Sequence, residues 1–264
     1  MEQKIPMDPL GDRLKAQEQV EAGRRANPKL PLMARLDGKS FHTFTRGLAR
    51  PYDTALSYLM IDTTKYLVEQ THAKLGYTQS DEITLYWWNP AGPVESSYMY
   101  DGKFQKLTSV LASMASAYFN QEVPKRLPSK AGALPVFDCR VWNVPDKQDV
   151  YLNFLWRQDD AIKNSISMAA QAYFSHKQLH GVGSEMKKQM LRELGHPWEN
   201  EPQFFKSGTF VQRKTQKVVL TEEHREKIPV KHRPVEGLRV DRSSVVDIGL
   251  GYIKDNLLAK EIFE

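Results

Sequence analysis

The chain has 264 residues, 41% of them apolar, which is enough to fill a core and indicates a folded protein. Its 37 Lys and Arg against 32 Asp and Glu give a net charge of +5, which permits a nucleic-acid partner without requiring one. The single cysteine, Cys139, excludes an intramolecular disulfide and a cysteine-based zinc site. No apolar run has the length of a membrane span, and no signal peptide is recognisable, so we expect a cytoplasmic protein without a membrane partner.

The first third of the chain predicts a helix, a strand and a second helix. Strong helix formers after an Asp-Pro opening predict a charged helix over residues 9–25. The short apolar segment 30–38 ends in Asp37-Gly38 and predicts a buried strand that runs into a turn. Helical spacing of apolar side chains predicts the second helix over 54–76, with Gly76 as its C-terminal stop.

The middle of the chain continues this alternation. Residues 82–88, EITLYWW, alternate as a strand does, and residues 106–123 form a helix rich in small residues. A strand with a proline at its end is predicted within 132–145, and one long or broken helical region over 147–181.

The C-terminal part is more charged and less regular. Residues 207–214 and 216–223 are predicted to pair as a hairpin, and residues 225–242 to form a basic loop broken by prolines. We therefore expect a catalytic domain over residues 1–184 and a C-terminal portion over 185–264 that packs on it.

Carboxylates stand at the ends of two of the predicted strands. Asp37 ends the first strand, while Asp81 and Glu82 begin the second. If these strands are antiparallel neighbours, Asp37 and Asp81 come together, and close carboxylates need a shared proton, a basic partner or a divalent cation. Mg²⁺ suits such oxygen ligands when phosphates complete its coordination. The alternative is structural, with Asp81 capping a turn and Glu82 solvated.

The segment after Asp37, DGKSFHTFTRGLARPYD, has the composition of an anion-binding loop. Gly38 permits a sharp turn, after which successive backbone amides can surround a triphosphate, namely those of Lys39, Ser40, Phe41 and His42. Positive charge is supplied nearby by Lys39, Arg46 and Arg50. The loop is neither a Walker loop nor a GxGxxG motif, and Asp-Gly alone is most often a simple turn.

ARLDGKSFHTFTRGLARPYD, followed some thirty residues later by GYTQSDEITLYW, resembles the paired signatures of the tRNA-His guanylyltransferase family and its Thg1-like relatives. The resemblance extends over roughly residues 9–170. It implies an α+β fold with a palm-like (ferredoxin-like) antiparallel sheet, flanking helices and a charged C-terminal extension. It also implies a nucleotidyltransferase that grows the 5′ end of tRNA in the 3′ to 5′ direction, and a homo-tetramer.

The resemblance assigns roles residue by residue. It makes Asp37 and Asp81 the ligands of two Mg²⁺ ions, with the Gly38 carbonyl in one coordination shell and Glu82 close beside them. Matching family positions are also held by Ser80, His42 and Arg50. We therefore expect the catalytic residues to be Asp37, Asp81, Glu82, Ser80 and His42. Together with the loop derived above, the residues expected around the nucleotide, GTP or ATP, are Lys39, Ser40, Phe41, His42, Arg50 and Asn164.

One departure from the family pattern bears on the substrate. The eukaryotic guanylyltransferases have HINNLYN shortly after WRQ, whereas this chain has WRQDDAIKNSISMA, with Ile162 at the histidine and Met168 at the final asparagine. Asn164 is retained. Absence of the segment is typical of the Thg1-like branch, which resembles template-directed repairers of truncated tRNA 5′ ends. Strict choice of tRNA-His and activation by 5′-adenylation are therefore not implied.

Two other functions remain open: a palm-type nucleotidyl cyclase or dinucleotide synthase, which would need no RNA, and a non-catalytic RNA-binding module. The remaining conspicuous residues favour structural roles. The tryptophans at 87, 88, 142 and 156 are expected in the core or on a sheet face, and His176 and His180 on a solvated helix face. Lys206 is a candidate phosphate contact. The basic pairs 187–188 and 213–214 and the segment 225–242 are candidate tRNA contacts.

Overall fold

The structure is a computed structural model that describes residues 8–88, 98–213, 216–219, 221–226, 230, 238–241 and 245–255. Its helices are α1 (Pro9–Ala22), α2 (Phe41–Phe44), α3 (Thr54–Thr71), α4 (Phe104–Arg126), α5 (Lys147–Tyr173), α6 (His176–Leu179), α7 (Ser184–Glu193), α8 (Gln203–Ser207) and α9 (Glu222–Glu226). Its strands are β1 (Leu32–Gly38), β2 (Leu75–Gln79), β3 (Glu82–Trp87), β4 (Phe137–Asn143), β5 (Thr209–Arg213), β6 (Gln216–Val219), β7 (Leu238–Asp241) and β8 (Val245–Asp247).

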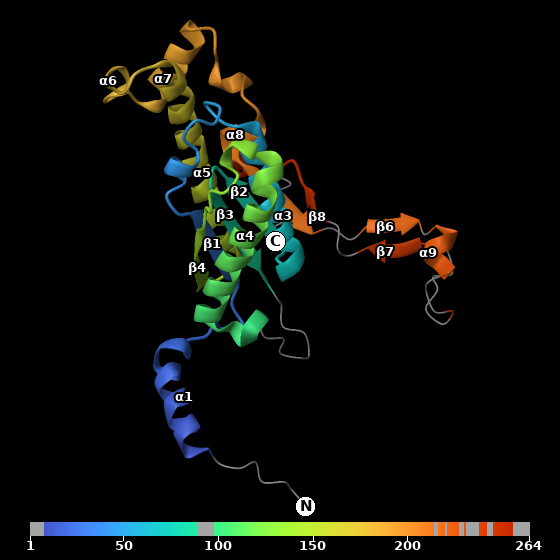
Figure 1. The fold of residues 1–264 in the computed structure, drawn as a ribbon. Helices are drawn as coiled ribbons and strands as arrows, with labels where there is room; N and C mark the ends of the chain where they lie inside the picture. Colours follow the sequence, from blue (N-terminus) through green and yellow to red (C-terminus); the bar gives the residue numbers. More distant parts are fainter. Residues whose placement is uncertain are drawn as a thin grey trace, which may run out of the picture.

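Six of the strands form one sheet in the order β4-β1-β3-β2-β5-β8, and every neighbouring pair is antiparallel. The other two strands, β6 and β7, pair separately and extend to one side of the molecule (Figure 1). The predicted α+β class with an antiparallel sheet and flanking helices is confirmed.

Helices cover both faces of the sheet because its strands alternate apolar side chains between two cores. One core lies between the sheet and α3 and α4, and it contains Leu36 and Ile83 from the strands. On the opposite face Met33 packs with Phe154 of α5 in a second core. A third, smaller core joins the C-terminal half of α5 to α6 and α7. The long helix α5 therefore connects the sheet to the upper helices in Figure 1.

The predicted stop of the second helix was wrong. The helix α3 ends at Thr71 because His72 takes the left-handed conformation, with φ 57°. Gly76 instead lies inside β2, a strand that the sequence analysis missed. A Cβ at Gly76 would lie 2.7 Å from Val68 Cγ2 and 2.9 Å from Thr64 Cγ2. The glycine thus lets α3 pack directly on the strand.

The predicted C-terminal hairpin was also wrong. β5 pairs with β2 and β8 in the main sheet, while β6 pairs with β7. Burial explains this choice, because Phe210 and Val211 of β5 are fully buried, one in each core. Part of the segment predicted as a basic loop, 225–242, is regular, since the last two residues of α9 and all of β7 fall within it. Its other residues except 230 lie outside the described ones.

The N-terminal helix α1 lies apart from the sheet (Figure 1), and none of its residues is buried. It begins where predicted, with Asp8 capping the first turn, and ends at Ala22, three residues early. None of the helices in the described part of the chain combines the length and apolarity that crossing a membrane requires. The division into residues 1–184 and 185–264 stays a prediction, although β5 and β8 from the second portion complete the sheet.

Candidate active site

A cavity of about 600 Å³ opens where the loop after β1 meets the turn between β2 and β3. Its walls come from the loop 38–57, the turn 79–81, α5 and α8. The predicted site residues in its lining are Gly38, Ser40, Phe41, His42, Arg50, Ser80, Asp81 and Asn164. The structure thus gathers residues from three separate segments around one space of a size that suits a nucleotide.

The predicted meeting of Asp37 and Asp81 depended on two antiparallel neighbouring strands, and that pairing is confirmed. β1 and β3 are antiparallel, with Asp37 opposite Glu82. The Gly38 amide donates a hydrogen bond of 3.1 Å to the Asp81 carbonyl, which fixes the turn against the end of β1. Asp37 is half-buried and Asp81 borders the cavity. Asp37 does not line the cavity, but its charge raises the pKa of Asp81, so the two carboxylates are near each other. The pair is called the acid edge below.

Burial governs the protonation of the acid edge. Desolvation raises the pKa of Asp81, and the charge of Asp37 raises it further. A backbone hydrogen bond, the Ser80 hydroxyl and the nearby His42 oppose these effects in part. The net direction of the pKa shift is upward, so the protein compensates the ionised carboxylate only in part. A bound cation would supply that compensation.

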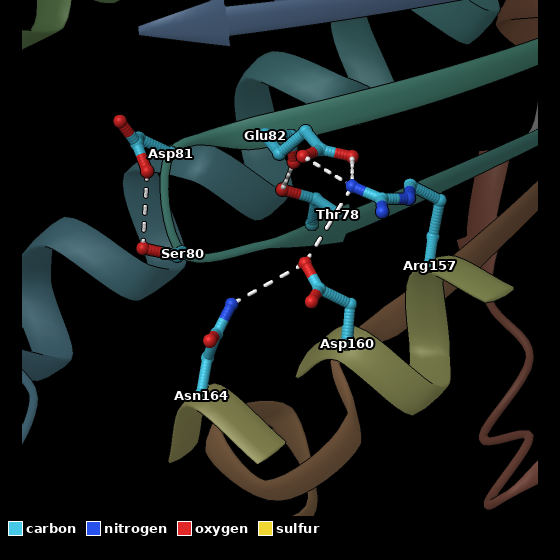
Figure 2. A network of polar contacts seen from close by, with 7 residues as sticks. All are labelled: Thr78, Ser80, Asp81, Glu82, Arg157, Asp160 and Asn164. Carbon is cyan, nitrogen blue, oxygen red and sulfur yellow. Dashed lines mark hydrogen bonds and ion pairs between the residues drawn. The ribbon is translucent and has the colours of Figure 1, made fainter. Parts of the chain in front are cut away.

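Glu82 follows Asp81 in sequence but has a different environment. Both of its carboxylate oxygens accept hydrogen bonds from Arg157 Nη1, at 3.2 and 3.1 Å (Figure 2). The Glu82 and Arg157 side chains are only 12% and 9% exposed. Burial raises the pKa of Glu82, while Arg157 and Arg35 lower it. The Glu82 carboxylate therefore forms a buried ion pair with Arg157. The sequence analysis did not predict this role of Arg157.

The same network reaches the cavity through α5. Arg157 lies 3.6 Å from Asp160, and Asp160 accepts a hydrogen bond of 3.4 Å from the amide of Asn164 (Figure 2). These residues are one helical turn apart, as the spacing of 157, 160 and 164 predicts. The side-chain nitrogen of Asn164 is therefore hydrogen-bonded to Asp160, and the residue also lines the cavity.

Ser80 forms the tight turn between β2 and β3. Its backbone is left-handed, with φ 49°, and its hydroxyl donates a hydrogen bond of 3.1 Å to Asp81 Oδ1. The turn orients Asp81 toward the cavity in this way. Thr78 supports it from β2, because its hydroxyl donates to the Glu82 carbonyl at 3.0 Å.

Some groups of the predicted anion-binding loop already make contacts within the protein. The Lys39 amide donates to the Val136 carbonyl at 2.9 Å, so it is not available to a phosphate. The Lys39 side chain is exposed and does not line the cavity. Phe41 is 3% exposed and packs in the core, which leaves only its backbone for a ligand. A Cβ at Gly38 would lie 2.3 Å from the Phe41 ring, so the turn requires glycine.

The far side of the cavity is aromatic, which the sequence analysis did not anticipate. Tyr52 follows Arg50 in the loop, and its ring lies 4.7 Å from Phe205 and 5.3 Å from Phe204 of α8, centroid to centroid. All three rings line the cavity. The cavity thus has a polar, acidic end and an apolar end, the division that a nucleotide's phosphates and base require.

Several secondary predictions can be placed. Lys206 donates to the Glu199 carbonyl at 2.6 Å, so its ammonium is held away from the cavity. Trp156 is 58% exposed, against the prediction of a core or sheet-face position. It projects from α5, and the Arg157 guanidinium lies 3.6 Å from its ring centroid. His176 and His180 are both exposed, with ring centroids 6.3 Å apart.

The acid edge fits Mg²⁺ by the chemistry of its donors. Two carboxylates and the backbone oxygen of Gly38 are hard ligands, and Mg²⁺ in nucleotide sites takes one or two carboxylates plus waters and phosphate oxygens. No cluster of three or more acidic, histidine or cysteine side chains suited to a metal occurs among the described residues. An ion at the acid edge would therefore depend on the nucleotide for part of its coordination.

Comparison with known proteins identifies the family. The model of the family described as tRNA-His guanylyltransferase (Thg1) matches residues 12–145. A bacterial Thg1-like protein, solved in complex with ATP, superposes with a TM-score of 0.76 at 32% identity, over 97% of this chain and 99% of that one. The chain belongs to the Thg1 tRNA-His guanylyltransferase family. It is thus a Thg1-family nucleotidyltransferase by homology.

Two further Thg1 relatives agree. The bacterial Thg1-like protein solved in complex with GTP superposes with the same TM-score, 0.76, at 29% identity over 97% of this chain and 99% of that one. The tRNA(His) guanylyltransferase of Debaryomyces hansenii is 27% identical over 216 residues, which cover 74% of this chain and 79% of that protein. The resemblance found in the sequence is confirmed, and it extends through the C-terminal portion in the structural comparison.

Proposed function

We propose that the protein adds nucleotides from NTPs to the 5′ end of a tRNA and releases pyrophosphate. The observation that supports this proposal is the antiparallel pairing of β1 and β3, in which Asp37 lies opposite Glu82 and thus near Asp81, a residue that lines a nucleotide-sized cavity. Family membership supplies the reaction class. The complexes of the bacterial Thg1-like protein with ATP and with GTP support an NTP as the occupant.

Each end of the cavity has a distinct role in this reaction. The NTP phosphates would lie at the acid edge, near Arg50 and the amides of Ser40 and His42, and the base would contact the aromatic end. Asp37 and Asp81 would hold two Mg²⁺ ions. These supply the charge neutralisation that an attacking hydroxyl and a departing pyrophosphate need. Gly38 would add its carbonyl to this ligand set.

The remaining site residues position the acid edge. Ser80 orients Asp81 through its hydrogen bond of 3.1 Å, and His42 contributes positive charge when protonated. Glu82 is better assigned to the ion pair with Arg157 than to the metal, because both of its oxygens contact that guanidinium. Lys39 would act only through its mobile ammonium. Asn164 lines the cavity from α5 and would contact the nucleotide.

The choice of RNA substrate is inferred from the absence of the HINNLYN segment that the eukaryotic guanylyltransferases have after WRQ. Ile162 and Met168 replace polar family residues on α5. We infer a template-directed repair of truncated tRNA 5′ ends rather than a dedicated addition of G to tRNA-His. A 5′-triphosphate could be attacked directly, whereas a 5′-monophosphate would need prior activation. Action as a homo-tetramer in the cytoplasm stays a prediction.

The test uses purified protein, Mg²⁺, all four NTPs and a labelled tRNA that lacks its first 5′ nucleotide. Both 5′-monophosphate and 5′-triphosphate forms are supplied, and products are resolved at single-nucleotide length. We expect growth by the nucleotide that pairs with the acceptor strand, and no growth with Asp37→Ala.

Other results would redirect the proposal. Addition of an unpaired G to tRNA-His alone would identify a guanylyltransferase. Consumption of NTP without RNA growth would support a cyclase or dinucleotide synthase. Tight RNA binding without any nucleotide chemistry would support the non-catalytic module.

A further inference from the structure

The loop 38–57, which forms one wall of the cavity and is called the cavity loop below, is held from outside by the segment between α4 and β4. The ammonium of Lys130 donates a hydrogen bond of 2.6 Å to the Arg46 carbonyl, across 84 positions of the chain. The Lys39 amide donates to the Val136 carbonyl of the same segment at 2.9 Å. Two points of the cavity loop are thus fixed by residues that do not line the cavity.

The contact of Lys130 falls on the least restrained part of the cavity loop. The two phenylalanines of the preceding helix, α2, are buried in the core. Arg46 and Gly47 are exposed, and Gly47 has φ 85°, a conformation that glycine adopts without steric cost. Among the hydrogen bonds of the described residues, only that of Lys130 joins residues 45–47 to a distant segment. This bond therefore restrains the peptide group between Arg46 and Gly47.

Lys130 is itself held in place by its surroundings. It ends a 3₁₀ turn (Pro128–Lys130), and its amide donates to the Leu127 carbonyl at 2.8 Å. Leu127 is buried in the same core as Phe44. The Lys130 ammonium also lies 5.9 Å from the centroid of the Phe44 ring, within the range of a cation–π contact. The donor to Arg46 is thus fixed relative to the core.

Arg46 lines the cavity and has the chemistry of a phosphate ligand. Its guanidinium presents forked donors that match the oxygens of a phosphate. An exposed residue beside a glycine has a mobile backbone, and ordering it on binding costs conformational entropy. The bond from Lys130 restricts that freedom before a nucleotide arrives.

The charge of Lys130 offers a second way to act on a nucleotide. In the described part of the chain, the lysines that form ion pairs are Lys65, Lys125 and Lys188. Lys130 is not among them, because its ammonium contacts a neutral carbonyl. Its charge could attract phosphates through space, without any part for Arg46. The position of the bond, at the residue that lines the cavity, favours an action through Arg46.

We propose that Lys130 is a positioning residue, which holds the backbone of Arg46 so that the Arg46 guanidinium contacts the terminal phosphates of the NTP. The inference rests on the proposed function, because it places an NTP in the cavity. It adds two residues to the phosphate end of that site. A purely structural Lys130 would restrain the loop without favouring a triphosphate over a monophosphate.

The test measures the dissociation constants of ATP and AMP by titration calorimetry, with Mg²⁺ and without RNA. Arg46→Gln should weaken ATP binding about tenfold. Lys130→Met should weaken it about fivefold. Both variants should bind AMP within about twofold of the wild-type protein, because AMP lacks the terminal phosphates.

A double-mutant cycle separates positioning from charge. If Lys130 acts through Arg46, adding Lys130→Met to Arg46→Gln should cause no further loss of ATP affinity. A charge that acts directly on the phosphates would weaken ATP binding in both backgrounds, and less so at high salt. Lys125→Met is the matched control, because it removes an equal charge from the exposed end of α4 and should leave ATP affinity unchanged. Urea unfolding verifies that each variant is folded.

Each outcome decides the inference. It is overturned if Lys130→Met binds ATP as the wild-type protein does, if ATP and AMP are weakened equally, or if the loss persists in the Arg46→Gln background. If the wild-type protein binds neither ATP nor GTP, the inference and the proposed function both fail. If the cycle shows the coupling but no NTP extends the RNA, the positioning role stands and the proposed activity fails.

Discussion

The acid edge lies beside a smaller cavity of about 310 Å³ that is lined by Arg35, Arg140 and Arg157. The two regions carry opposite charge, and they could not be recognised equally well in the sequence. Asp37 and Asp81 each stand at the boundary of a strand, next to turn residues, where acids are conspicuous. Arg35 lies between Ala34 and Leu36 inside an apolar strand. The lesson is that a strand end can be recognised locally, whereas a site in the middle of a sheet is created by the register between distant segments.

The largest expected effect separates the two regions by activity. Asp81→Asn should lower the rate of nucleotide addition at least about 1000-fold, which corresponds to roughly 4 kcal/mol of barrier. Its cause is the loss of a metal-binding charge. Arg140→Gln removes a half-exposed cation and no carboxylate, so it should lower the rate by no more than about tenfold. Single-turnover extension assays measure both. Asp62→Asn on α3 is the matched control and should be neutral. A D81N protein retaining a tenth of the activity would remove Asp81 from the metal site.

The second prediction compares two arginines of the same cavity by stability. Arg157→Ala leaves the buried Glu82 carboxylate unpaired, so the free energy of unfolding should fall by about 3–5 kcal/mol. Arg140→Ala breaks a half-exposed pair with Asp138 and should cost less than about 1 kcal/mol. Urea unfolding measures both values. Equal losses would mean that the Glu82–Arg157 pair does not anchor α5 to the acid edge.

The third prediction concerns metal binding. Mg²⁺ at a hundred times its dissociation constant, in the presence of a non-reacting ATP analogue, should stabilise the folded protein by about 2.7 kcal/mol. The shift should be largely lost in Asp81→Asn and kept in Arg140→Gln, because Asp81 would supply a ligand oxygen whereas a guanidinium supplies none. Thermal unfolding with and without EDTA measures it. An unchanged shift in D81N would place the ion elsewhere.

The smallest effect is a pH dependence of stability. Burial raises the pKa of Asp81 in the folded protein, so the folded state binds more protons than the unfolded state between the two pKa values. Stability from this group is therefore full at low pH and lost as pH rises through the raised folded value.

The matching variant tests that sign. Asp81→Asn cannot ionise, so metal-free D81N should be slightly more stable than the wild-type protein at neutral pH, and the difference should vanish on acidification. Chemical unfolding at a series of pH values in EDTA gives the comparison. A less stable D81N at neutral pH would show that the ionised carboxylate has a compensating partner.

Much of the fold could be predicted from the sequence, and the failures have specific causes. Helical spacing of apolar side chains located α3, and the segments that contain α4 and α5 were also predicted as helical. A short apolar run that ends in Gly38 located β1, and alternation located β3. The prediction for Gly76 was wrong because a glycine can end a helix or permit close packing on a strand. Only the contact with Val68, which the sequence does not reveal, shows that Gly76 has the second role. The C-terminal strands were assigned to each other because they are close in sequence, whereas burial of Phe210 drew β5 into the main sheet.

For the site, the sequence located the acids and the loop but not their partners. The pairing of Glu82 with Arg157 joins residues 75 positions apart, and no local pattern reveals it. The aromatic end of the cavity likewise joins Tyr52 to Phe204 and Phe205 across most of the chain. Residue types that follow strand ends can be recognised one segment at a time, but a contact between segments requires the fold.

The pairing of β5 with β8 has an architectural consequence. Arg213, the last residue of β5, lies opposite Val245, the first residue of β8, so the chain leaves the sheet and returns at the same place. Topologically, everything from 214 to 244 is an insertion into a β-hairpin. Gln158 secures the return by donating to the Gly251 carbonyl at 2.9 Å and accepting from the Ile253 amide at 2.8 Å. Antiparallel strands can be joined by a turn of two residues, so the pairing of β5 with β8 in the main sheet does not depend on the length of the segment inserted between them.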